Sequence, residues 1–101
     1  MSVVLFEVKN HIAYVTVNRP EVLNCFNYET LSSLQETVDE IAKNNDVRVV
    51  IFTGAGSKAF SAGADLKERK TLNDEQVRRN VKAIRDVFNS IAELPQPTIA
   101  A

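Results

Sequence analysis

The sequence is poor in the residues that build disulfides and zinc sites. Its 101 residues include one cysteine, Cys25, and one histidine, His11. A single cysteine excludes a disulfide within the chain, and no cluster of Cys and His has the spacing of a zinc site. We therefore expect no bound metal, and a reducing compartment such as the cytoplasm is the simplest location.

An excess of charge and long apolar runs are also missing. The 12 basic and 13 acidic residues give a net charge of −1, so electrostatics offers no reason to expect nucleic acid or an anionic membrane as a partner. No apolar run approaches the roughly 20 residues that a membrane helix needs. The start of the chain lacks the basic leader and long apolar core of a signal peptide. These absences predict a soluble protein.

Three motifs with well-defined chemistry are absent. The pair Gly54 and Gly56 begins a dinucleotide-binding pattern, but the third glycine is not at the required spacing. There is no P-loop, and Ser61 does not lie in the Gly-x-Ser-x-Gly pattern of a nucleophile elbow. Cys25 has no basic neighbour that would favour a thiolate, so we interpret it as a loop-packing residue. A nucleotide-binding Rossmann site and a Ser/His hydrolase are both disfavoured.

The first half of the chain predicts strands and one amphipathic helix. Residues 3–9 and 12–18 are rich in β-branched and aromatic side chains, and only Asn10-His11 separates them, as in a tight hairpin. Asn27 is a suitable N-cap for a helix that reaches about Lys43, and the nearly continuous apolar run at 47–53 follows as a strand buried on both faces. Strand, helix and strand predict a right-handed βαβ crossover. Apolar residues at helical spacing form the expected buried stripe of the helix: Leu31, Leu34, Val38, Ile41 and Ala42.

A second helix and a final strand are predicted after residue 72. Asn73 and Gln76 have the spacing of a capping box, and prolines 95 and 97 end the helix. Residues 98–101 have the character of a strand's first residues. We interpret residues 1–101 as the N-terminal portion of a single α/β domain, with a hairpin followed by a parallel βαβ unit. The expected buried stripe of the second helix is Val77, Val81, Ile84, Phe88 and Ile91.

The segment 60–68 carries the strongest indication of chemistry. Small residues around Gly63 allow backbone N–H groups to approach a ligand closely. An acidic residue directly after them, Asp65, suits the first turn of a helix, where N–H groups lack partners. Backbone donors at such a place can stabilise a developing oxyanion. For Asp65 itself we favour helix capping over a catalytic role, because no second carboxylate or metal-ligand pattern accompanies it.

Three stretches in this order resemble the enoyl-CoA hydratase/isomerase (crotonase) superfamily. They are residues 18–27, which begin Asn-Arg-Pro-Glu, residues 60–67, which contain Ala-Gly-Ala-Asp, and residues 94–101, which contain Pro-Gln-Pro. Each is weak alone, but the ordered set matches over essentially the whole chain. The resemblance implies a fold of ββα spiral units and an acyl-CoA thioester as substrate, with no further cofactor.

The resemblance also implies roles for particular residues. Members of the superfamily stabilise an enolate-like thioester oxygen with two backbone N–H groups, and the first donor falls on Ala64. Gly63 permits the backbone bend beside it. The implied substrate-binding residues come from two segments: Val22, Leu23, Cys25, Ala62, Gly63, Ala64, Asp65 and Leu66.

Other parts of the family's machinery have no counterpart in these residues. The second donor belongs to a Gly-Gly-Gly stretch beyond the Pro-x-Pro strand, and hydratases carry two catalytic glutamates further on. The resemblance therefore implies that the 101-residue chain is inactive alone, that a complete member hydrates a 2-enoyl-CoA in fatty acid β-oxidation or related lipid metabolism, and that it forms a trimer or hexamer. An isomerase, another crotonase-type reaction and a noncatalytic CoA-binding fragment remain alternatives.

Residues 64–69 and 91–95 are especially similar to methylglutaconyl-CoA hydratases, some of which bind RNA through a lysine-rich first helix. Here the matching helix contains Glu29, Glu36, Asp39 and Glu40 and ends at a single lysine. Phosphate binding needs positive charge, so we do not carry the RNA-binding role over to this chain.

Overall fold

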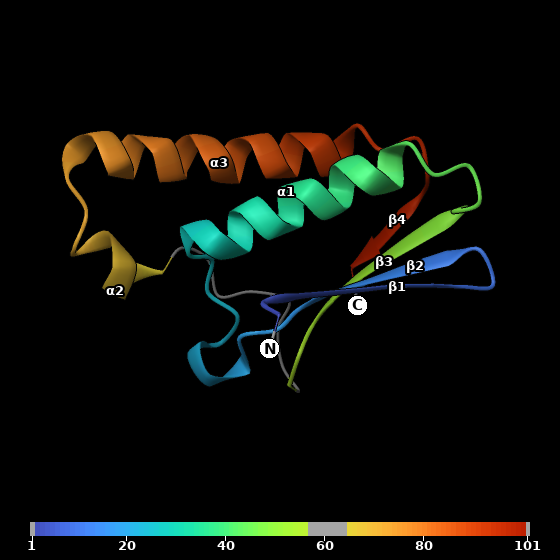
Figure 1. Ribbon diagram of the computed structural model, residues 1–101, viewed down its shortest axis with the longest axis horizontal. Helices are drawn as coiled ribbons and strands as arrows, with labels where there is room; N and C mark the ends of the chain where they lie inside the picture. Colours follow the sequence, from blue (N-terminus) through green and yellow to red (C-terminus); the bar gives the residue numbers. More distant parts are fainter. Residues whose placement is uncertain (1, 57–64, 101) are drawn as a thin grey trace.

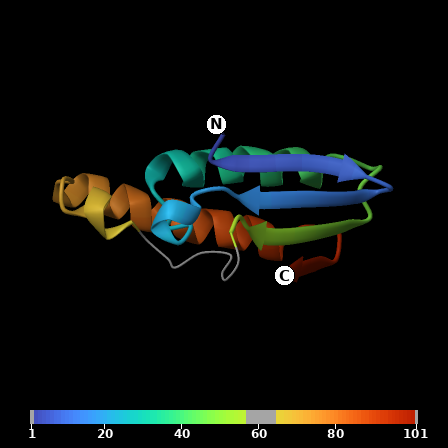
Figure 2. The ribbon, with the colours of Figure 1, turned by 90° about the horizontal axis from the view of Figure 1, so that it is seen from below.

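A computed structural model describes residues 2–56 and 65–100 of the chain. The described residues form a four-stranded sheet with the order β1-β2-β3-β4 and two long helices on one of its faces (Figures 1 and 2). The elements are β1 (Val4–Lys9), β2 (Ile12–Val17), a 3-10 turn (Pro20–Val22), α1 (Tyr28–Ala42), β3 (Val49–Gly54), α2 (Leu66–Arg69), α3 (Asp74–Ala92) and β4 (Thr98–Ala100).

The first two strands form the predicted hairpin. β1 and β2 pair antiparallel, with Lys9 opposite Ile12. Both turn residues have positive φ, 53° at Asn10 and 66° at His11, which matches the right-handed twist of the flanking strands. His11 is also held from outside the turn, because its Nδ1 lies 2.9 Å from the carbonyl oxygen of Asp46.

The strand–helix–strand unit is confirmed as a parallel arrangement. β2 pairs parallel with β3, and β3 pairs parallel with β4. α1 begins where predicted, because the side chain of Asn27 accepts a hydrogen bond of 2.9 Å from the backbone N–H of Thr30. That bond satisfies one of the N–H groups that a helix start leaves without a partner.

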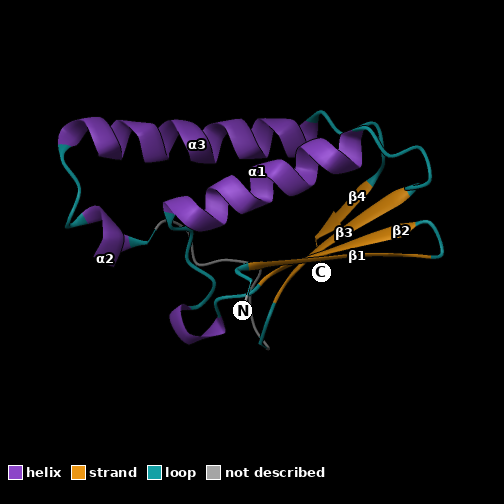
Figure 3. Ribbon diagram, viewed as in Figure 1, coloured by secondary structure: helices purple, strands orange, loops and turns teal. Residues whose placement is uncertain are grey.

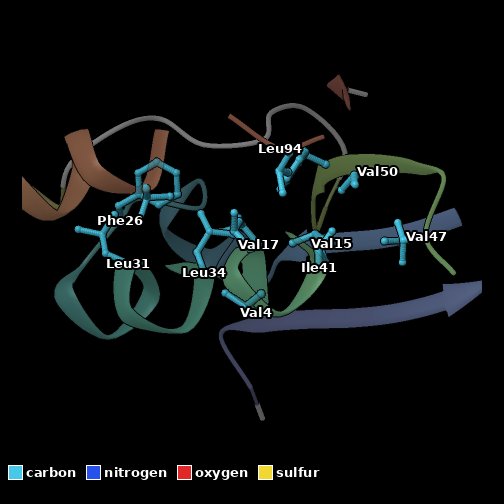
Figure 4. Packing of buried hydrophobic residues seen from close by; sticks show 14 residues of the cluster. Val4, Val15, Val17, Phe26, Leu31, Leu34, Ile41, Val47, Val50 and Leu94 are labelled. Atoms are coloured by element: carbon cyan, nitrogen blue, oxygen red, sulfur yellow. The ribbon is translucent and has the colours of Figure 1, made fainter. Parts of the chain in front are cut away.

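The main core lies between the sheet and α1 (Figure 4). Leu31, Leu34, Val38 and Ile41 are almost fully buried, as predicted, but Ala42 at the end of the stripe is exposed. β3 is not buried on both faces: Val50 and Phe52 are buried, whereas the alternate residues are half-buried. The prediction failed because no described element covers the opposite face of the sheet as α1 and α3 cover this one (Figure 2).

α3 has the predicted start and end but not the predicted buried stripe. Asn73 and Gln76 form both bonds of a capping box, and the helix ends before Pro95. Val87 and Asn80 are buried, whereas Val81 and Phe88 are 47% and 43% exposed. The other members of the stripe are half-buried, and Ile84 and Ile91 pack against the core. The rings of Phe88 and Phe26 meet in an edge-on arrangement, with their centroids 5.9 Å apart.

Candidate functional site

The loop before α1 is held in an unusual backbone conformation. The 3-10 turn is followed by Leu23 and Asn24, which have φ values of 56° and 57°. L-residues seldom adopt this left-handed region, and a branched side chain such as leucine does so at a cost of about 1–2 kcal/mol. The side chain of Leu23 is largely exposed, so packing of that side chain does not explain the conformation.

The side chain of Asn24 supplies the compensating contacts. Its Oδ1 accepts a hydrogen bond of 2.8 Å from the backbone N–H of Arg19, and its Nδ2 donates one of 3.0 Å to the carbonyl oxygen of Ala55. Asn24 is 2% exposed, so these bonds are shielded from water. They close the loop on itself and attach it to the end of β3.

The loop meets the segment that begins at Asp65, 46 residues after Arg19 in the sequence. The Arg19 guanidinium lies 3.1 Å from the Asp65 carboxylate and donates a 2.6 Å hydrogen bond to the carbonyl oxygen of Cys25. The backbone N–H of Asp65 donates to the carbonyl oxygen of Phe26 at 2.9 Å. We call this contact between residues 19–26 and residues 65–68 the loop–α2 junction; it lies at the end of the molecule opposite the hairpin turn (Figure 3).

Asp65 caps the start of α2, as the sequence predicted. Its Oδ1 accepts a 3.0 Å hydrogen bond from the backbone N–H of Glu68. This hydrogen bond, together with the Arg19 guanidinium, holds the pKa of the Asp65 carboxyl below its usual value of 3.8. A carboxylate stabilised in its charged form is poorly suited to exchange protons near neutral pH. The geometry agrees with a capping and pairing role for Asp65.

The described members of the predicted substrate-binding set lie in the two segments that meet at the loop–α2 junction. Val22, Leu23 and Cys25 lie in the loop, and Asp65 and Leu66 lie across the junction. Leu23 and Leu66 are each 65% exposed, which leaves two apolar side chains open to a ligand. The other predicted members, Ala62, Gly63 and Ala64, lie outside the described residues, and the role of all eight residues in substrate binding stays a prediction.

Two residues of the junction were not identified by sequence reasoning. Arg19 and Asn24 belong to the first stretch of the family resemblance, but nothing in the local pattern assigned them partners. Arg19 finds its partner only through the tertiary fold. Asn24 offered a weak signal, because asparagine tolerates positive φ better than most residues and bonds readily to nearby backbone.

Neither a cluster of metal ligands nor a membrane-spanning helix occurs in the part of the chain that the structure describes. Within residues 2–56 and 65–100, no group of three or more His, Cys, Asp or Glu side chains is placed to hold a metal ion. In the same part of the chain, no helix is long and apolar enough to cross a membrane.

Known proteins resemble this chain in sequence over nearly its whole length. Residues 7–101 match the sequence profile of the family described as enoyl-CoA hydratase/isomerase. The putative enoyl-CoA hydratase/isomerase YngF of Bacillus subtilis is 48% identical over 99 residues, which are 97% of this chain and 38% of that protein. The short-chain-enoyl-CoA hydratase of Clostridium acetobutylicum is 40% identical over 98 residues, again 97% of this chain and 38% of the relative.

Solved structures agree with the sequence matches. The enoyl-CoA hydratase from Bacillus anthracis superposes with a TM-score of 0.92 at 41% identity, covering 97% of this chain and 38% of that one. An enoyl-CoA hydratase/carnithine racemase from Magnetospirillum magneticum gives a TM-score of 0.90 at 37% identity, over 99% and 38% of the two chains. The chain thus has the crotonase-like α/β fold that its motifs predicted, and it spans about two fifths of the length of these relatives. It belongs to the enoyl-CoA hydratase/isomerase family.

Proposed function

We propose that this chain contributes one half of an acyl-CoA site whose reaction is the addition of water to the double bond of a 2-enoyl-CoA. The observation that carries the proposal is the loop–α2 junction. It holds Asp65 by its backbone N–H, its carboxylate and its helix cap at once. Asp65 is bonded directly to Ala64, the residue that the family resemblance assigns as an oxyanion donor.

The proposed chemistry follows from where charge moves. When the oxygen of water attacks C3 of the enoyl thioester and loses a proton to a base, the C2–C3 π electrons shift onto the thioester oxygen. A backbone N–H aimed at that oxygen stabilises the resulting enolate, and protonation at C2 completes the addition. Removing one such donor typically costs about 2.7–4 kcal/mol of transition-state stabilisation, so the Ala64 N–H would be a major contributor.

The acid–base groups are proposed to lie outside these 101 residues. Asp65 is engaged by Arg19 and by the Glu68 N–H, and the Glu68 carboxylate is engaged by backbone and amide donors. Neither is free to serve as the base that activates water. The proposal therefore assigns to this chain the binding of the thioester and one oxyanion donor, and assigns proton transfer to groups outside it.

An isomerase is the second candidate, because the matched family is described by both reactions. Isomerisation moves the double bond from the C3–C4 position to the C2–C3 position through a similar enolate, so the same Ala64 donor would serve. The third candidate is that the chain is a noncatalytic fragment that only binds CoA thioesters. We propose an acyl-CoA thioester as the ligand in all three cases, and a trimeric or hexameric assembly for the active enzyme.

Kinetic assays separate these possibilities. Crotonyl-CoA hydration and 3-enoyl-CoA isomerisation would be measured with the 101-residue polypeptide and with the longest polypeptide that its gene encodes. We expect hydration by the longest polypeptide and none by the 101 residues alone. Turnover by the 101-residue polypeptide would contradict the placement of the acid–base groups. Turnover of only the 3-enoyl substrate would replace hydration with isomerisation, and CoA thioester binding without either reaction would support the noncatalytic alternative.

A further inference from the structure

Glu68 links α2 to both long helices. Its Oε1 accepts a 3.0 Å hydrogen bond from the backbone N–H of Tyr28, the first residue of α1, and Oε2 lies 3.3 Å from the same nitrogen. The Nδ2 group of Asn80, on α3, donates a 2.8 Å hydrogen bond to Oε1. One carboxylate therefore joins three elements that are separate in sequence.

The surroundings of Glu68 stabilise its hydrogen bonds to α1 and α3. A helix start leaves its first N–H groups without partners inside the helix, and it favours negative charge. Asn80 is only 8% exposed, so its bond to Glu68 is shielded from water. On the same corner, the Arg79 guanidinium lies 3.8 Å above the centre of the Tyr28 ring, which further fixes α3 against the start of α1.

α2 needs such external support because it is short. Four residues are far fewer than the roughly 12–15 at which an isolated helix becomes even marginally stable. The contacts that place α2 come from the two ends of the segment Asp65–Glu68. Asp65 is held by Arg19 and by the carbonyl oxygen of Phe26, and Glu68 is held by Tyr28 and Asn80.

We propose that Glu68 is a positioning residue for the oxyanion donor assigned to Ala64. This inference rests on the proposed function. Glu68 acts by fixing α2, and with it Asp65, on α1 and α3, and Asp65 is the residue that follows Ala64 in the sequence. It does not exchange protons with the substrate. A displacement of about 1 Å at a catalytic group can cost about 100-fold in rate. A shift of α2 after loss of the Glu68 contacts is therefore expected to lower the rate if it also displaces the N–H of Ala64.

The Oδ1 atom of Asn80 allows the hydrogen bond between Asn80 and Glu68 to be tested by substitution. No described residue donates a hydrogen bond to Asn80 Oδ1, which is buried. In Glu68→Gln, the amide oxygen can still accept from Tyr28, and the new NH2 group can donate to Asn80 Oδ1. Asn80→Asp instead places a second carboxylate against Glu68. Combining Glu68→Gln with Asn80→Asp restores one donor and one acceptor, with the original number of charges.

The variants would be made in the longest polypeptide that the gene encodes and assayed with crotonyl-CoA. Glu68→Ala and Asn80→Asp are expected to lower kcat by about 10–100-fold with little change in KM. Glu68→Gln and the double variant are expected to retain most of the activity. Glu40→Ala, an exposed change on α1, is the matched control and should leave both constants unchanged. Amide hydrogen exchange at Asp65 and Tyr28 would be measured for every variant.

The outcomes separate this inference from the function on which it rests. An unaltered protein without enoyl-CoA turnover would refute the proposed function, while amide exchange would still report whether Glu68 anchors α2. Faster exchange at Asp65 in Glu68→Ala with an unchanged kcat would overturn the positioning role. A Glu68→Gln variant with normal amide exchange and a kcat as low as that of Glu68→Ala would also overturn it, because it would indicate proton transfer by Glu68. Should Glu68→Ala fail to fold, recovery of kcat in the double variant relative to Asn80→Asp decides the question.

Discussion

The core beneath α1 and the loop–α2 junction are held by different forces. In the core, apolar residues of α1 and β2 are almost completely buried; Leu34, Ala13, Val15 and Val17 have no exposed surface. At the junction the contacts are polar: an ion pair, a helix cap and backbone bonds join two segments. We therefore expect most of the stability to come from apolar burial in the core, and the placement of the candidate site to depend on the polar contacts of the junction.

The largest expected effect is in the core. Leu34→Ala removes a fully buried side chain from between α1 and the sheet, and should lower the free energy of unfolding by about 2–5 kcal/mol. Leu5→Ala on β1 is the control, because Leu5 is 43% exposed and has less burial to lose. Urea unfolding followed by circular dichroism measures both. Equal losses would mean that burial in this structure does not determine stability.

A smaller but specific effect is expected at the junction. Arg19→Met removes the partner of Asp65 and the donor to the Cys25 carbonyl oxygen. Hydrogen bonds to charged groups contribute about 1.5–3 kcal/mol, and both side chains here are at most 15% exposed, so solvent screening is limited. The same urea experiment measures the loss, with Arg48→Met, an exposed arginine before β3, as control. A loss no greater than that of the control would show that the ion pair does not stabilise the junction.

The smallest expected effect is a pH-dependent loss of stability at the loop–α2 junction, which the apolar core should not show. The pKa of Asp65 is lowered in the folded chain, so its charge contributes stability above its usual value of 3.8 and loses that contribution as the pH falls through the folded pKa. Asp65→Asn should therefore be less stable than the unaltered chain at pH 7, and the difference should shrink as the pH falls below 3.8. The deficit of Leu34→Ala should stay nearly constant over this range. Unfolding curves at several pH values test the contrast; a constant deficit for Asp65→Asn would contradict it.

Local rules were enough to predict most elements of the fold. The hairpin at Asn10-His11, the N-cap at Asn27 and the capping box at Asn73 depend on neighbours within a few residues, and all three are confirmed. Periodicity identified the apolar side of α3 but not what covers it, so Val81 and Phe88 were wrongly predicted to be buried. A repeat of apolar residues indicates which face prefers burial, whereas exposure depends on the elements packed around that face.

The candidate site was predictable only in part, for a related reason. The cap at Asp65 follows from its own sequence position and is confirmed. The partners of Arg19 and Glu68 come from segments 46 and 40 residues away, and no local pattern pairs them. The family resemblance implied that Leu23 and Leu66 bind the substrate; both side chains are exposed, and their role in binding stays a prediction.

The central claim is that the Ala64 N–H donates to the thioester oxygen of an acyl-CoA. It can be measured by nuclear magnetic resonance of the 15N-labelled longest polypeptide, titrated with butyryl-CoA and, in parallel, with S-butyl-CoA, a thioether that lacks the carbonyl group. The account predicts that the Ala64 amide proton shifts downfield with the thioester and not with the thioether. Binding of both compounds with the same response at Ala64, or with none, would contradict the claim.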